Sequence, residues 1–126
     1  MSFLDMDFSD VVEPHAVEPD KEYKVRIVDV REDTDKNGNP YIMPRLEVVD
    51  EPGAKDFTYF MGLPRDDMDA KRKNAAKYRI KTFIEAFDVD PKMDTQDWVG
   101  AEAWAILGKE ENDQYGEQNF VKKFVR

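Results

Sequence analysis

The sequence of 126 residues has no cysteine and only one histidine, His15. Without cysteine the chain can form no disulfide, and it offers neither a thiolate nucleophile nor a cysteine zinc site. His15 lies in a stretch rich in Pro and Glu, which makes it a poor centre for a metal site or a catalytic triad. We therefore expect no catalytic residues, no metal site and no cofactor.

Long apolar runs are also missing. The first residues, MSFLDMDFSDVV, are acidic and have too few consecutive apolar residues for a signal peptide or a membrane-spanning helix. We expect a cytoplasmic protein with no membrane partner. The length is sufficient for one domain with one hydrophobic core.

Basic residues are the minority, because 19 Lys and Arg stand against 28 Asp and Glu, a net charge of −9. Residues 1–20 hold six carboxylates and no Lys or Arg, so they contribute −6 and leave −3 on residues 21–126. Acidic segments of this kind are most often disordered tails. We divide the chain into an acidic N-terminal segment, residues 1–20, and one domain, residues 21–126. Within that domain, residues 65–81 are locally basic.

The first half of the domain has the pattern of three strands. Residues 21–32 alternate between apolar and polar side chains, with a one-residue change of phase after Ile27 that is typical of a β-bulge. Asn37-Gly38 predicts a hairpin, since both residue types tolerate a positive φ, and residues 41–49 form its second strand. Residues 56–62 are rich in β-branched and aromatic side chains and predict the third strand.

A helical pattern follows over residues 67–87, and residues 95–98 look like a short capped turn. Strands are predicted again over residues 101–110 and 118–125. Five strands with a helix between strands three and four are the element order of the OB-fold, a small Greek-key barrel. We therefore expect a mainly β protein of this architecture.

An OB-fold binds oligonucleotides on the face of strands two and three and with the loops that join strands one to two and four to five. Alternation points Tyr41 and Arg45 outward, and we expect Phe57 and Tyr59 to face outward as well. Aromatic rings on such a face stack on bases, and Lys and Arg contact phosphates. The alternative, that rings belong to the core, stays open for strand three and is our expectation for Trp104. The predicted single-stranded-DNA-binding residues are Arg26, Lys36, Tyr41, Arg45, Phe57, Tyr59, Tyr115 and Lys122.

Several segments together carry a resemblance to a known family. They are MSFLDMDFSDV, EYKVRIVDV, DKNGNPYIMPRLEVVD, the Trp98-Val99-Gly100 segment leading into AWAILGKEE, and YGEQNFVKKF. In this order the chain resembles the phage-encoded single-stranded-DNA-binding proteins of OB-fold type. The resemblance implies sequence-nonspecific binding and protection of single strands in phage DNA replication or recombination, in the host cell cytoplasm, with no catalytic residues. The acidic segment is N-terminal here, whereas other single-strand binders have an acidic C-terminal tail for partners.

Two other classes of function remain open. A protein–protein adaptor could recruit a recombination or replication factor without binding DNA, and the acidic N-terminal segment with Phe3, Leu4, Met6 and Phe8 could dock such a partner. A nuclease could use carboxylates to hold Mg²⁺. The carboxylates at Asp33, Asp35, Asp66, Asp67 and Asp69 fall in predicted turns and at a helix start, where Asp is favoured for capping.

Overall fold

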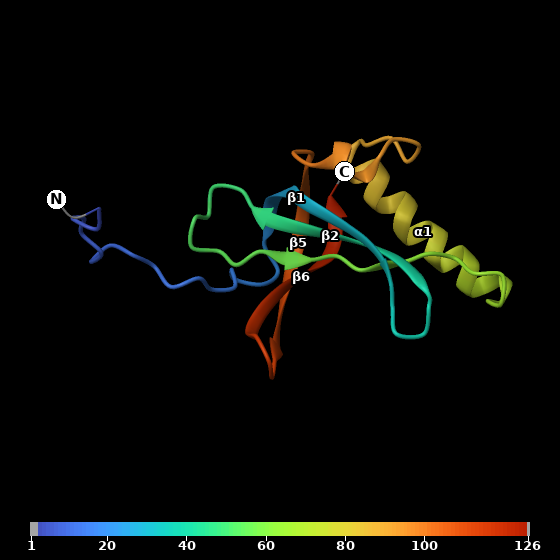
Figure 1. Cartoon of the computed structure of the whole chain (residues 1–126), viewed down its shortest axis with the longest axis horizontal. Helices are drawn as coiled ribbons and strands as arrows, with labels where there is room; N and C mark the ends of the chain where they lie inside the picture. The colour runs from blue at the N-terminus through green and yellow to red at the C-terminus, as the bar shows by residue number, and fades with distance from the viewer. Residues whose placement is uncertain (1–2, 126) are drawn as a thin grey trace.

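The structure, a computed structural model, describes residues 3–125, and residues 1, 2 and 126 lie outside the described part. The chain is mainly β, and its only α-helix in the described part lies between the third and fourth predicted strands, as expected (Figure 1). Within residues 3–125, no helix is long and apolar enough to cross a membrane. The elements are β1 (Glu22–Thr34), β2 (Pro40–Val48), β3 (Phe57–Thr58), β4 (Met61–Gly62), α1 (Ala70–Phe87), the 3-10 helix η1 (Thr95–Trp98), β5 (Glu102–Asn112) and β6 (Gly116–Val125).

The strands form one antiparallel sheet in the order β3-β2-β1-β5-β6, and β4 pairs with β2 beside β3. The predicted third strand is therefore two short strands. The sheet is open, because within residues 3–125 no ladder joins β6 to β3 or β4. We predicted a barrel, and the closing ladder of that barrel is not found. Helix α1 instead packs against both β4 and β6, the strands on the two sides of the opening.

The first hairpin has the predicted bulge and the predicted turn. The register of β1 against β2 shifts between Ile27 and Asp29, which confirms the change of phase read from the sequence. In the turn, the carboxylate of Asp35 accepts hydrogen bonds from the backbone N–H groups of Asn37 (2.8 Å) and Asn39 (2.9 Å). Gly38 has a φ of 79°, whereas Asn37 keeps a negative φ. Only one of the two residues thus adopts the left-handed conformation that we expected both to tolerate.

Helix α1 begins at a side-chain cap and contributes two aromatic rings to the core. The carboxylate of Asp69 accepts a hydrogen bond from the backbone N–H of Arg72 at 2.8 Å, which satisfies one unpaired donor of the first turn. Phe83 and Phe87 are buried, and their ring centroids lie 4.6 Å apart. Phe83 also lies 5.9 Å from Trp98, so the helix and η1 close the core together.

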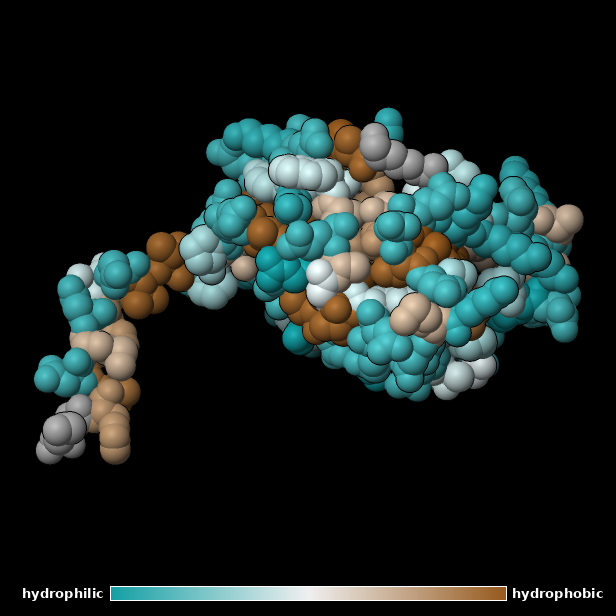
Figure 2. All heavy atoms as spheres, turned by 90° about the horizontal axis from the view of Figure 1, so that it is seen from above, coloured by the Kyte–Doolittle hydropathy of each residue, from teal (hydrophilic) through white to brown (hydrophobic). Residues whose placement is uncertain are grey.

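Residues 15–21 attach the N-terminal segment to the domain. The backbone N–H of His15 donates to the carbonyl of Gly53 at 2.9 Å, and the buried side chain of Asn119 exchanges two hydrogen bonds with the backbone of Val17, at 2.8 and 3.0 Å. Residues 3–14, which we call the arm, are exposed throughout and extend away from the domain (Figure 1). Seen from above, hydrophobic and hydrophilic residues are interleaved along the arm (Figure 2).

Candidate functional site

Two aromatic rings are in contact beside the outer face of β2, Tyr41 of β2 itself and Phe60 of the segment between β3 and β4. Tyr41, Met43, Arg45 and Glu47 are exposed or half-buried, while Pro44, Leu46 and Val48 are buried, so the predicted phase of this strand is confirmed. The ring of Tyr41 lies against the ring of Phe60, with 5.0 Å between centroids and an angle of 34° between planes. We call Tyr41 and Phe60 the ring pair. Phe60 is 50% exposed, so the pair presents aromatic surface to solvent.

Phe57 and Tyr59 do not face outward, and this prediction is wrong. Phe57 is 4% exposed and Tyr59 is 7% exposed. The ring of Tyr59 packs in the core, 5.6 Å from Phe83 and 5.3 Å from Phe124 between centroids. Burial raises the pKa of the Tyr59 phenol, and the nearby charge of Arg79 opposes part of that rise.

The exposed ring of this segment is Phe60, which was not among the predicted residues. The signal that could have found it is the composition of the two alternating sets. Phe57, Tyr59 and Met61 form a wholly apolar set, whereas Phe60 shares its set with Thr58 and Gly62, which are poor core residues. The wholly apolar set is the one that the structure buries.

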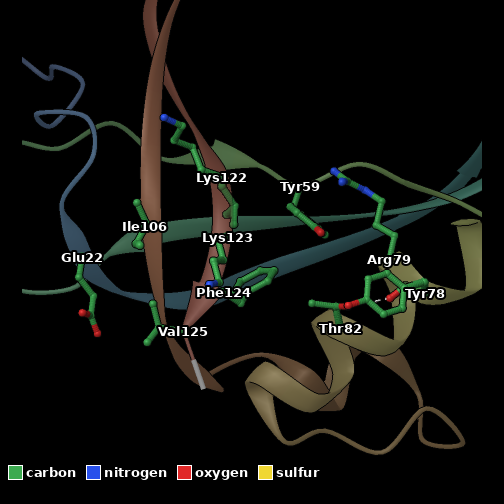
Figure 3. A pocket seen from close by; sticks show the side chains of 11 residues that line it. Glu22, Tyr59, Tyr78, Arg79, Thr82, Ile106, Lys122, Lys123, Phe124 and Val125 are labelled. Carbon is green, nitrogen blue, oxygen red and sulfur yellow. Dashed lines mark hydrogen bonds between the residues drawn. The ribbon is translucent and has the colours of Figure 1, made fainter.

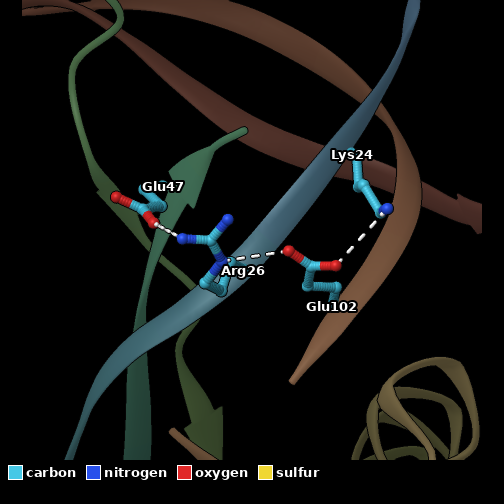
Figure 4. A network of polar contacts seen from close by, with 4 residues as sticks. All are labelled: Lys24, Arg26, Glu47 and Glu102. Carbon is cyan, nitrogen blue, oxygen red and sulfur yellow. Dashed lines mark hydrogen bonds and ion pairs between the residues drawn. The ribbon is translucent and has the colours of Figure 1, made fainter. Parts of the chain in front are cut away.

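Arg26 is held by two carboxylates on the outer face of the sheet. Its Nη1 lies 2.9 Å from Oε1 of Glu47, and its Nε lies 3.0 Å from Oε2 of Glu102 (Figure 4). Lys24 approaches the other oxygen of Glu102 at 3.4 Å. The hydrogen bond from Arg26 is the main cause that lowers the pKa of Glu102. The charge of Arg26 is therefore balanced by two carboxylates, and its contact with DNA stays a prediction.

Arg31 and Arg45 of this face are paired in the same way. Arg31 contacts Asp33 at 3.0 Å, and Nε of Arg45 lies 3.6 Å from Asp56. Trp104, which we expected in the core, is 48% exposed on β5, and the Nζ of Lys24 lies 6.0 Å from its ring centroid. The outer face of the sheet thus offers exposed rings together with charges that are largely balanced.

The two predicted loops are the turns of two separate hairpins, β1–β2 and β5–β6. Lys36 is exposed in the turn between β1 and β2, and within the described residues it has no carboxylate partner. Tyr115 is exposed in the turn between β5 and β6, where Nζ of Lys55 donates to its carbonyl at 3.2 Å. The last residues of β1 pair with the start of β2, where Tyr41 pairs with Asp33. Lys36 comes directly after β1, so it lies at the ring-pair end of the sheet.

A groove of about 690 Å³ opens between α1 and β6, with Tyr59 between the side chains of the two elements (Figure 3). The groove contains two predicted residues, Tyr59 and Lys122, and Nζ of Lys122 lies 2.6 Å from Oδ1 of Asp20. The residues that line the groove include Tyr59, Tyr78, Arg79, Lys122, Lys123 and Phe124. Arg79 lies in the stretch that we identified as locally basic, and it was not among the predicted site residues.

Three of the carboxylates considered for a metal, Asp33, Asp35 and Asp69, accept hydrogen bonds from backbone N–H groups. Asp35 binds the N–H groups of its own turn and Asp69 caps α1, which is the role that turns and helix starts favour for Asp. Among residues 3–125, no three acidic or histidine side chains converge in a group that could hold a metal ion.

The model of a family described as "Protein of unknown function (DUF669)" matches residues 4–124. No curated protein matches the chain.

Proposed function

The chain belongs to the DUF669 family, and we propose that it binds single-stranded DNA without sequence preference. The ring pair of Tyr41 and Phe60 is the observation that carries this proposal, because two exposed rings in contact on a sheet face offer surface for base stacking. Lys36, at the same end of the sheet, supplies a cation that can contact a phosphate.

The architecture supports the proposal. β1 pairs with β2 on one side and with β5 on the other, and α1 precedes β5, which is the element order of an OB-fold whose barrel is open. In an OB-fold, oligonucleotides lie across strands two and three. The ring pair comes from β2 and from the segment between β3 and β4, so it occupies the corresponding face.

The resemblance to phage single-stranded-DNA-binding proteins gives the proposal its setting. We propose that the protein coats and protects single strands during phage DNA replication or recombination in the host cytoplasm. Stacking on aromatic rings is tolerant of sequence because every base has a π-face. The balanced charge of the outer face fits a binder that relies on stacking more than on charge.

Fluorescence anisotropy with a labelled oligo-dT and the matched duplex tests this function. We expect the single strand to bind more tightly than the duplex. With two to four phosphate contacts, the logarithm of the affinity should fall with the logarithm of salt concentration with a slope of about −1.4 to −2.8. Tighter binding to the duplex, or no binding to oligo-dT, would refute the proposal.

The arm favours a second function, the docking of a protein partner. Phe3, Leu4, Met6 and Phe8 are exposed on a segment that extends away from the domain, and Asp5 and Asp7 lie between them. Exposed apolar side chains in such number mark interaction sites. We propose that the arm docks a replication or recombination protein. A pull-down with the wild-type chain and with a Phe3→Ser/Phe8→Ser variant tests this, and equal recovery of every partner by both would refute it.

A further inference from the structure

Most of the cations that have no carboxylate partner lie on α1 rather than on the outer face of the sheet. On the outer face of the sheet, Lys24, Arg26, Arg31 and Arg45 all contact a carboxylate. Within the described residues, α1 is the element richest in unpaired cations, which are Lys71, Lys73, Lys77 and Arg79. A strand held only on the outer face of the sheet would therefore meet Lys36 as the unpaired cation at the ring-pair end of that face.

Arg79 is fixed in the groove with its outer nitrogens unused. Its Nε donates to the carbonyl of Phe60 at 2.8 Å, and its guanidinium carbon lies 4.1 Å from the ring centroid of Tyr59. No other hydrogen bond or ion pair of this side chain occurs within residues 3–125. A guanidinium held in this way keeps two terminal nitrogens for an oxyanion and loses little rotamer freedom on binding it.

The opposite wall of the groove adds a second unpaired cation. Lys123 is exposed on β6 and has no carboxylate partner within the described part of the chain. Lys122 is shared with Asp20, and Glu22 also lines the groove, so these two carboxylates partly offset its positive charge. Arg79 and Lys123 are thus the cations that an anion entering the groove would meet unopposed.

The groove also offers aromatic surface. Tyr78 stands on its α1 side and is 65% exposed, while Tyr59 and Phe124 form its buried floor. Lys71 lies on the same face of α1 as Tyr78, because residues 71, 75, 78 and 82 follow the helical spacing of four, three and four. The α1 side therefore presents the exposed ring of Tyr78, with Lys71 on the same helical face and Arg79 lining the groove.

We propose that the groove between α1 and β6 is a second subsite for single-stranded DNA, in which Arg79 and Lys123 bind the phosphates of the strand leaving the ring pair. Phe60 joins the two subsites, since its ring belongs to the ring pair and its carbonyl accepts the hydrogen bond from Arg79. This proposal rests on the proposed function. It assigns stacking to the outer face of the sheet and most phosphate contact to the opening between the sheet edges.

The test is the salt dependence of oligo-dT binding, measured by anisotropy on the full chain. Lys123→Gln removes an exposed cation with no partner, and Lys92→Gln removes a similar exposed cation outside the groove as the matched control. Each lost phosphate contact should flatten the slope by about 0.7, so the affinity ratio between 50 and 200 mM salt should change by about 2.6-fold. Arg79→Gln should flatten the slope in the same way, and Lys92→Gln should leave it unchanged.

A ring-pair variant separates the two subsites. Tyr41→Ala should weaken binding at every salt concentration and leave the slope unchanged, because stacking releases no counterion. If Lys123→Gln and Arg79→Gln bind oligo-dT with the wild-type slope, the groove proposal is wrong and the proposed function stands. If the wild-type chain does not bind oligo-dT at all, both fail together.

Discussion

Nε of Arg79 donates a hydrogen bond of 2.8 Å to the backbone carbonyl of Phe60, which ties helix α1 to the segment that presents an exposed ring. The same guanidinium covers the ring of Tyr59 at 4.1 Å. Two consecutive residues of one segment thus face opposite ways, Tyr59 into the core and Phe60 to solvent, and one side chain contacts both. Arg79 therefore positions the ring pair as well as the groove.

Arg79→Met should lower the free energy of unfolding by about 1 kcal/mol, since it removes a hydrogen bond from a charged donor and a cation–π contact at an exposed position. Urea unfolding measures this change. Lys77→Met is the matched control, because Lys77 is an exposed cation on the same helix with no partner within the described residues. Equal losses in both variants would show that the contact with Phe60 does not stabilise the fold.

Tyr41→Ala and Phe60→Ala should each weaken oligo-dT binding by about 1–3 kcal/mol, the contribution of stacking on one base. Their melting temperatures should stay close to that of the wild-type chain, because both rings are at least partly exposed. Met93→Ala, which shortens another exposed apolar side chain, serves as the control. If a ring-pair variant binds oligo-dT as tightly as this control does, the ring that it lacks is not part of the DNA-binding site.

Tyr59→Ala should behave in the opposite way, with a loss of about 3–5 kcal/mol in unfolding free energy, as is usual when a buried aromatic side chain is truncated. Thermal or urea unfolding measures it. A stable Tyr59→Ala variant with weakened DNA binding would restore our sequence-based prediction that Tyr59 faces outward.

Tyr59 also gives a pH dependence. Burial raises its pKa above the ordinary value of 10.0, so the unfolded chain loses this proton at a lower pH than the folded chain. The contribution of the protonated Tyr59 phenol to the stability of the fold is therefore complete below about pH 10, and it is lost as the pH rises through the pKa of the folded state. Tyr59→Phe keeps the ring and removes the titration, so its stability should fall less steeply above about pH 10. Identical alkaline profiles would contradict the burial of this phenol.

Deletion of residues 1–14 should leave the melting temperature unchanged, because attachment to the domain begins at His15. The arm holds four carboxylates, at Asp5, Asp7, Asp10 and Glu13, which can compete with DNA for cations. The truncated chain should bind oligo-dT more tightly at low salt, and this gain should shrink as salt screens the competition. Unchanged affinity at every salt concentration would show that the arm does not compete with DNA, and partner docking would then be its one proposed role.

Much of the sheet could be predicted from the sequence because β1 and β2 each have one apolar and one polar face. The bulge near Ile27 and the outward position of Tyr41 both follow from that contrast. β5 carries the same signal, since Glu102 marks the outer face, and the position of Trp104 two residues later follows from it. We placed Trp104 in the core because the apolar Ile106 shares its face, and that face is only half-buried at Ile106 and exposed at Trp104.

Three features could not be predicted from local sequence: the phase of β3 and β4, the attachment of Val17 and the groove. β3 and β4 are two residues each, so alternation has too few positions to fix their phase. The attachment of Val17 by Asn119 joins residues 102 positions apart and leaves no local pattern. The groove likewise needs Arg79 of α1 and Lys123 of β6, which only the opening between the sheet edges brings to one surface.

Ultraviolet crosslinking of the full chain to oligo-dT, followed by mass spectrometry of the crosslinked peptides, tests the central claim most directly. The account predicts that thymine crosslinks to peptides that contain Tyr41 or Phe60, and that excess unlabelled oligo-dT removes these crosslinks while the matched duplex does not. Crosslinks confined to Trp104 or to the arm, or the absence of any crosslink that oligo-dT competes away, would contradict it.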